Sequence, residues 1–204
     1  GNTVSLHAAR GEYISFQLVL TSLTKETLDN IRVGMIPFRK GEDEFSIKPE
    51  LFLEWAVEVK TPSTGYPVAS LGNGWYPDAL IPFQYIQDDS SRVRWRWTYP
   101  LWLPDFNNRI DDQKSLVIWI DQYIPFLRNE AAPGTYSSEL AITIKGLTRK
   151  IPVSLTVWDF ALPNENRFRA GLQHEGFTRN MTGRNELEIY QLLKRNRISM
   201  LDPT

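Results

Sequence analysis

The sequence predicts a mainly β chain. We expect an immunoglobulin-like antiparallel β-sandwich over residues 1–163 and an incomplete βαβ piece of a (β/α) barrel over residues 164–204. Three observations lead to this prediction. Apolar and polar side chains alternate at period two in the first part, Gly and Pro turns separate these runs, and a clear helical pattern comes only after Pro163.

The first strands are read from this alternation. In the segment Glu12–Ser22, Ile14, Phe16, Leu18 and Leu20 lie on one side and polar residues mostly on the other, which predicts a half-buried strand. Further strands are predicted over residues 30–38, 51–60, 92–102 and from about residue 115.

A hairpin closes the predicted sandwich. Pro133 and Gly134 indicate a turn, after which a strand runs from Thr135 to Lys145. Gly146 and its neighbours form a second turn, and residues 151–160 return antiparallel.

Beyond Pro163 the pattern changes to a strand, a helix and a second strand. A polar linker precedes a strand within residues 168–176, a helix over residues 185–196 and a strand at 198–201. Forty residues of this kind cannot enclose a core of their own. We therefore expect the chain to be the front part of a larger protein, cut within its second domain.

The composition narrows the classes of function. The chain of 204 residues has 23 basic and 24 acidic residues and a net charge of −1, so it lacks the basic excess of a nucleic-acid-binding protein. It has no cysteine, which excludes disulfides and thiolate metal sites, and no apolar run long enough to span a membrane. Aromatic residues are abundant, with seven Trp, eight Tyr and ten Phe, and such rings either fill protein cores or stack on sugars.

Four segments, in this order, carry a family resemblance: AARGEYISFQLVL from Ala8, GWYPDALIPF from Gly74, APGTYSSELAITI from Ala132 and IPVSLTVWDFALP from Ile151. Together they resemble the N-terminal region of bacterial proteins similar to family 123 glycoside hydrolases. The resemblance covers nearly the whole chain and implies an N-terminal β-sandwich followed by a (β/α)₈-type catalytic barrel.

The resemblance also implies an activity for the larger protein. It implies retaining hydrolysis of a β-linked N-acetylhexosamine-type glycan, in which the substrate's own acetamido group attacks the anomeric carbon. The family's catalytic Asp-Glu pair lies on a later barrel strand and has no match here, so no catalytic residue is assigned and this chain alone is expected to be inactive. The resemblance implies a secreted, periplasmic or cell-surface bacterial protein. We predict no cofactor and no metal, and a glycan substrate bound through the barrel.

The candidate substrate-binding residues fall into two groups. His174, Glu175 and Arg179 lie at or just after the C-terminal end of the first predicted barrel strand, the end at which barrel active sites form. Trp75 and Tyr76 belong to the segment GWYPDALIPF, where they could contact a sugar. The interpretation we favour is a rigid apolar loop plugging one end of the fold, with Asp78 capping the turn after Pro77.

Other candidates have plainer interpretations. Trp95, Trp97 and Tyr99 share one strand face and form either a sugar platform or, as we favour, part of the sandwich core. Pairs at Asp88-Asp89 and Asp111-Asp112 are interpreted as turn residues rather than acid–base or Ca²⁺ sites. The two histidines, His7 and His174, fall in different predicted domains, which argues against a shared metal site.

Three roles therefore stay open for residues 1–163. We favour a non-catalytic domain that braces the barrel. A carbohydrate-binding module using a Trp/Tyr surface and a protein–protein assembly domain are the alternatives.

Overall fold

The computed structural model describes residues 3–62, 70–86, 100–105, 110–163, 171–172, 183–195 and 198–200. The chain divides into two compact units, Gly1–Ala161 and Leu162–Thr204. The prediction of a mainly β chain is confirmed, with one helix in the described part of the chain.

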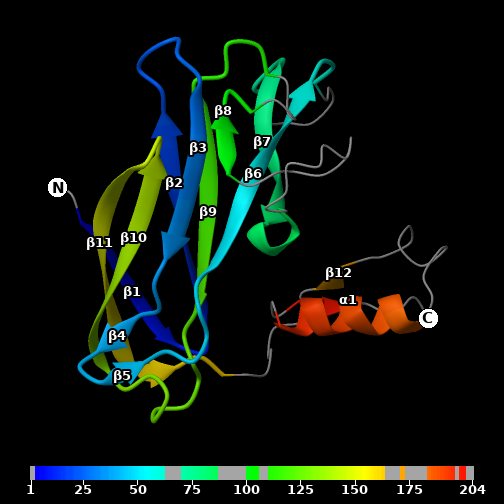
Figure 1. Ribbon diagram of the computed structural model, residues 1–204. Helices are drawn as coiled ribbons and strands as arrows, with labels where there is room; N and C mark the ends of the chain where they lie inside the picture. The colour runs from blue at the N-terminus through cyan, green and yellow to red at the C-terminus, as the bar shows by residue number, and fades with distance from the viewer. Residues whose placement is uncertain are drawn as a thin grey trace. The chain divides into compact units, whose positions relative to one another are not determined.

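The first unit contains two sheets, whose strands can be followed in Figure 1. The seven-stranded sheet has the order β1-β11-β10-β3-β8, with the short strands β4 and β5 attached beside β10. Its strands are β1 (Val4–Arg10), β3 (Leu28–Met35), β4 (Arg39–Lys40), β5 (Asp43–Glu44), β8 (Leu101–Leu103), β10 (Gly134–Ile144) and β11 (Leu147–Ala161).

The four-stranded sheet has the order β2-β9-β6-β7, and all its pairings are antiparallel. Its strands are β2 (Tyr13–Thr21), β6 (Glu50–Val59), β7 (Gly74–Pro82) and β9 (Ser115–Tyr123), and a 3₁₀ turn, η1 (Phe83–Tyr85), follows β7. The predicted inner residues of β2, Ile14, Phe16, Leu18 and Leu20, pack against the core, so that alternation is confirmed.

One hydrophobic cluster joins the two sheets. It takes Leu53 from β6 and Ile118 from β9 in the four-stranded sheet, and Tyr136 and Leu155 from β10 and β11 in the seven-stranded sheet. Since all four are essentially inaccessible to solvent, the sheets pack face to face across a single core.

The hairpin of β10 and β11 follows the prediction. Gly134 to Ile144 pair antiparallel with Leu147 to Val157, and the two-residue loop is Lys145-Gly146. Both loop residues have positive φ, 48° and 82°, which is the geometry that matches the twist of the strands. The alternation does not predict β1, which pairs parallel with β11 at the edge of the sheet.

The segment GWYPDALIPF was expected to be a loop, and this prediction is wrong: residues 74–82 form strand β7. Strand β7 is the edge strand of its sheet, where prolines are tolerated because a missing N–H need not pair. Asp78 does not cap a turn. Trp55 pairs with Ala79 and Ala56 with Pro77, so Asp78 is the extra residue of a β-bulge.

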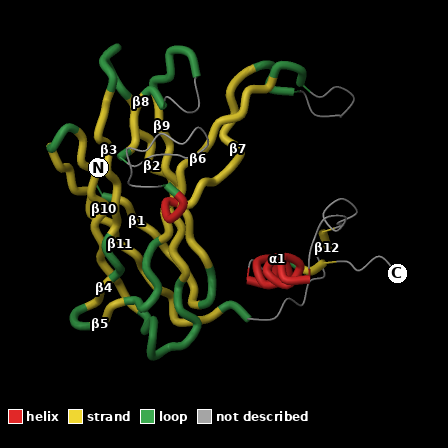
Figure 2. The backbone as a smooth tube through the Cα atoms, turned by 45° about the vertical axis from the view of Figure 1, so that its right-hand side comes forward, coloured by secondary structure: helices red, strands yellow, loops and turns green. Residues whose placement is uncertain are grey.

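Beyond Leu53, strand β6 pairs with β7 and no longer with β9. Figure 2 shows the two strands curving together away from the rest of the sheet. The bulge at Asp78 accounts for the bend, because an extra residue kinks a strand and increases its twist. Val57 lies on the inner side of β6 yet is 41% exposed, so this part of the hairpin extends past the core.

The second unit is described at three elements: β12 (Gly171–Leu172), helix α1 (Gly183–Arg195) and β13 (Ser199–Met200). Strands β12 and β13 pair in parallel with α1 between them in sequence, as the strand–helix–strand pattern predicted. Leu187 and Leu192 of α1 are each 57% exposed. No helix in the described ranges has the length and apolarity needed to cross a membrane.

Candidate functional site

Trp75 and Tyr76 do not form one shared sugar-binding surface. They are consecutive residues of β7, so their side chains point to opposite faces of the sheet. Trp75 is 39% exposed, whereas Tyr76 is half-buried and donates its hydroxyl hydrogen to the carbonyl oxygen of Gly72 at 3.0 Å. The Tyr76 hydroxyl therefore fixes the entry into the strand, and Trp75 remains available to solvent.

Several other candidates lie outside the residues that the structure describes. These are His174, Glu175 and Arg179, the pair Asp88-Asp89, and the aromatic residues Trp95, Trp97 and Tyr99. Asp111 and Asp112 are described and form a turn, with Asp112 at a φ of 53°. This agrees with the turn interpretation of that pair.

His7 is an exposed residue of β1 with an aromatic neighbour. Its ring stacks on Trp158 of β11 at a centroid distance of 6.1 Å, and Trp158 stacks on Phe160 at 5.7 Å. Across the described ranges, no three His, Asp or Glu side chains gather closely enough to hold a metal ion. His7 is therefore better described as the end of a row of three stacked rings, followed by Trp158 and Phe160.

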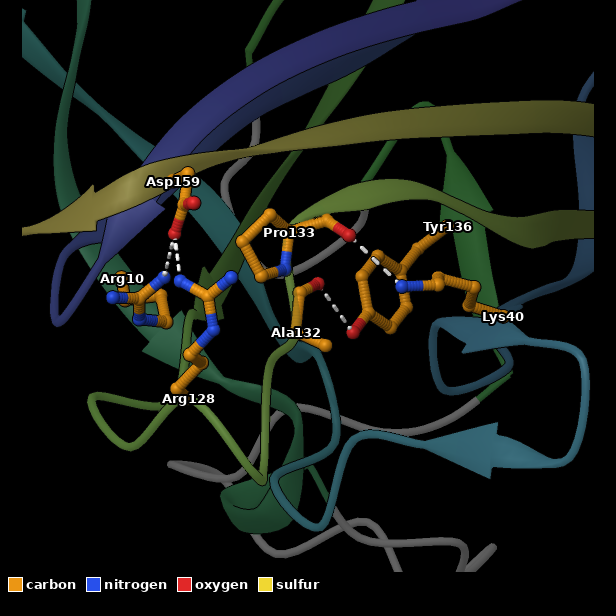
Figure 3. A network of polar contacts seen from close by, with 7 residues as sticks. All are labelled: Arg10, Lys40, Arg128, Ala132, Pro133, Tyr136 and Asp159. Carbon is orange, nitrogen blue, oxygen red and sulfur yellow. Dashed lines mark hydrogen bonds and ion pairs between the residues drawn. The ribbon is translucent and has the colours of Figure 1, made fainter.

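Asp159 connects two arginines near the end of β11. Its Oδ1 atom accepts a hydrogen bond from Arg128 and lies 3.6 Å from Nη1 of Arg10 (Figure 3). The hydrogen bond from Arg128, assisted by the charges of both guanidinium groups, holds the pKa of Asp159 below its ordinary value of 3.8. Arg10 is 9% exposed, so Asp159 supplies the counter-charge that a buried cation requires.

A second cluster of polar contacts surrounds Tyr136 at the start of β10. The Tyr136 hydroxyl donates to the carbonyl oxygen of Ala132 at 2.9 Å, and Lys40 Nζ donates to that of Pro133 at 2.9 Å (Figure 3). Burial, together with the charge of Asp43, raises the pKa of Tyr136 above 10.0. Tyr136 therefore stays neutral and anchors the strand, and it is no candidate nucleophile.

Among the residues that the structure describes, aromatic and polar side chains gather on the outer side of β2, β9 and β6. We define the outer aromatic face by nine residues of these three strands: Tyr13, Ser15, Gln17, Glu50, Phe52, Glu54, Trp119, Asp121 and Tyr123. The pairing register places Ser15, Asp121 and Glu50 in one row and Gln17, Trp119 and Phe52 in the next. The neighbouring residues Leu116, Ile118 and Ile120 of β9 are buried, so the nine residues lie on the side away from the core.

Hydrogen bonds fix this face. Asp121 Oδ1 accepts from Trp119 Nε1 and from Ser15 Oγ, both at 2.5 Å. Gln17 Nε2 donates to Glu54 Oε1 at 2.6 Å, which links β2 to β6 across the intervening β9. The rings of Tyr13 and Tyr123 meet at a centroid distance of 5.0 Å.

The nine residues of the outer aromatic face combine two kinds of chemistry. They offer aromatic surface for stacking and carboxylate and amide groups for hydrogen bonding. Sequence reasoning recognised the strand from Ser115 but assigned no role to Trp119 or Asp121. The available signal was the period-two placement of Trp119, Asp121 and Tyr123, which needed the partner strands before it could indicate a site.

Comparison with known proteins gives a likeness of fold. No family model matches the chain, and no curated protein sequence matches it. A solved structure of a family 123 glycoside hydrolase from Clostridium perfringens, described in connection with glycolipid glycan hydrolysis, resembles it with a TM-score of 0.56 and 16% identity. The likeness covers 84% of this chain and 26% of the hydrolase chain, so this chain spans about a quarter of that protein. The shared property is the fold.

Proposed function

We propose that this chain is the N-terminal part of a glycoside-hydrolase-like protein that acts on β-linked N-acetylhexosamine-type glycans. In this proposal residues 1–163 are a non-catalytic, immunoglobulin-like sandwich that braces a (β/α) barrel, and residues 164–204 begin that barrel. The observation that carries the proposal is the fold likeness to the family 123 glycoside hydrolase over 84% of the chain. His174, Glu175 and Arg179 would then contribute to the substrate side of the barrel.

Tyr136 supports the immunoglobulin-like part of the proposal. A tyrosine near the start of a strand, hydrogen-bonded to a backbone carbonyl a few residues upstream, is a recurring feature of such sandwiches. Tyr136 bonds to Ala132 in this way at the start of β10. Tyr76 bonds to Gly72 with the same spacing at the start of β7.

The second unit supports the barrel part. Parallel β12 and β13 joined through α1 are the repeating unit of a (β/α) barrel. The exposed Leu187 and Leu192 give α1 apolar surface that further layers of a barrel would bury.

The test compares this chain with the protein as its native host produces it. Both are assayed with an aryl N-acetyl-β-galactosaminide. We expect hydrolysis by the native protein and none by residues 1–204 alone. Hydrolysis by the 204-residue chain would overturn the non-catalytic role, and an inactive native protein would argue against the glycosidase-like parent.

A further inference from the structure

We propose that the outer aromatic face of the four-stranded sheet is a binding site for a neutral oligosaccharide, with Trp119 as its stacking ring. This site lies in the first unit and uses none of the residues assigned to the barrel. The proposal therefore stands or falls independently of hydrolysis by a larger protein.

The first argument is the fixed orientation of Trp119. Its ring nitrogen is bound to Asp121 at 2.5 Å, and Ser15 binds the same carboxylate oxygen, so the indole is held before any ligand arrives. Trp119 is also only partly buried, which leaves ring surface for contact. A ring held in place loses little conformational entropy on binding, and this favours a weakly stacking ligand such as a sugar.

The second argument is the set of polar groups around the indole. Asp121, Glu50 and Glu54 supply carboxylate oxygens, which accept hydrogen bonds, and Gln17 supplies an amide that both donates and accepts. Gln17 and Ser15 are exposed, and Gln17 lies directly opposite Trp119 in the pairing register. A sugar presents many hydroxyl donors beside apolar C–H groups, which matches carboxylates placed beside aromatic rings.

The third argument is charge. The nine residues of the outer aromatic face include three carboxylates and no Lys or Arg. Such a face repels sialylated or sulfated sugars, nucleic acid and anionic lipid. Neutral glycans remain as the ligand class that suits this face, because their hydroxyl groups can donate hydrogen bonds to the carboxylates and carry no negative charge.

A flat sheet face could instead be a buried contact with another protein. The polar groups of this face argue against a buried protein contact. The hydrogen bonds to Asp121 and Glu54 lie among partly exposed side chains on a charged surface. Protein interfaces of the buried kind are depleted in Asp and Glu at their centre. The sugar is therefore the occupant that the face favours.

The experiment measures binding of the 204-residue chain to three neutral tetrasaccharides by isothermal titration calorimetry. The probes are cellotetraose, laminaritetraose and N-acetylchitotetraose, with tetragalacturonate as the anionic probe and tetralysine as the cationic one. We expect saturable binding of at least one neutral probe and none of tetragalacturonate. Binding of tetralysine alone, or of no neutral probe, would overturn the proposal and, in the first case, indicate a basic protein partner.

Two variants and a matched control locate the site. Trp119→Ala should weaken binding of the neutral probe about tenfold, since a ring stacking on a ligand contributes roughly that factor. Gln17→Ala, at an exposed position that the core does not use, should weaken it about threefold. Trp158→Ala removes an exposed tryptophan from the other sheet and should leave the affinity unchanged.

Thermal unfolding followed by circular dichroism establishes that each variant is folded. If Trp119→Ala fails to fold, Gln17→Ala decides the matter alone. Unchanged affinity in Gln17→Ala and in folded Trp119→Ala, or a loss in Trp158→Ala, would place the sugar elsewhere and refute this assignment.

Discussion

At the residue scale, Arg10 shows how an ion pair is retained at the edge of a core. Its side chain is 10% exposed, and its Nε and Nη1 atoms have no hydrogen-bond partner within the described ranges. Asp159 Oδ1 lies 3.6 Å from Nη1 of Arg10, and Arg128 contacts the same carboxylate. Removing the carboxylate would leave a buried cation without compensation, a change that costs more than losing an exposed pair.

We therefore predict that Asp159→Asn destabilises the first unit at neutral pH and that the difference vanishes in acid. The folded-state pKa of Asp159 is depressed, so its contribution is fully present above its unfolded value of about 3.8 and is lost as the pH falls through the folded value. Thermal midpoints of variant and parent, measured from pH 7 to pH 2, should converge at the acid end.

The matched control is Asp111→Asn, an exposed turn aspartate. Its thermal midpoint should follow that of the parent throughout the same pH range. A gap between Asp159→Asn and the parent that persists at pH 2 would mean that the charge of Asp159 is not the cause.

At the element scale, the alternation of apolar and polar side chains predicted the positions of strands well but indicated poorly which strands lie side by side in a sheet. Strand β2 and the β10–β11 hairpin follow their patterns because each has one buried face and a turn made by Gly and its neighbours. Strand β7 was missed because Pro77 and Pro82 are typical of loops in sequence. Only its place at the sheet edge, together with the bulge at Asp78, makes them compatible with a strand.

The β10–β11 turn provides a test of backbone conformation. Gly146 has a φ of 82°, so Gly146→Ala should destabilise the first unit by about 1–2 kcal/mol, because a Cβ is strained there. Gly34 in β3 has no positive φ, and a methyl group added to its Cα would meet open space. Gly34→Ala should therefore stabilise the unit by about 0.4–1 kcal/mol, since it restricts the unfolded chain.

Both glycine variants are measured by urea unfolding with a common m-value. Opposite signs are the expected result. If Gly146→Ala were neutral, the left-handed turn would not be a requirement of this hairpin.

At the scale of the whole molecule, the sequence could not reveal the outer aromatic face. Its residues come from three segments, 13–17, 50–54 and 119–123, and β9 lies between strands that precede it in the chain by many residues. Each segment taken alone reads as an ordinary half-buried strand with a polar outer side. Long-range pairing, which local patterns do not encode, brings Trp119 between Gln17 and Phe52.

The last prediction concerns independence of the first unit. The core residues contributed by both sheets lie between Val4 and Val157, so a chain of residues 1–161 keeps the whole of that cluster. We expect this fragment to fold alone and to unfold in one cooperative transition of about 5–15 kcal/mol, with coincident circular dichroism and tryptophan fluorescence curves. It should also bind the neutral tetrasaccharide as the longer chain does, since the outer aromatic face lies entirely within it. A fragment that is unfolded, or whose two curves separate, would mean that residues 162–204 contribute to the stability of the first unit and that the two units fold as one.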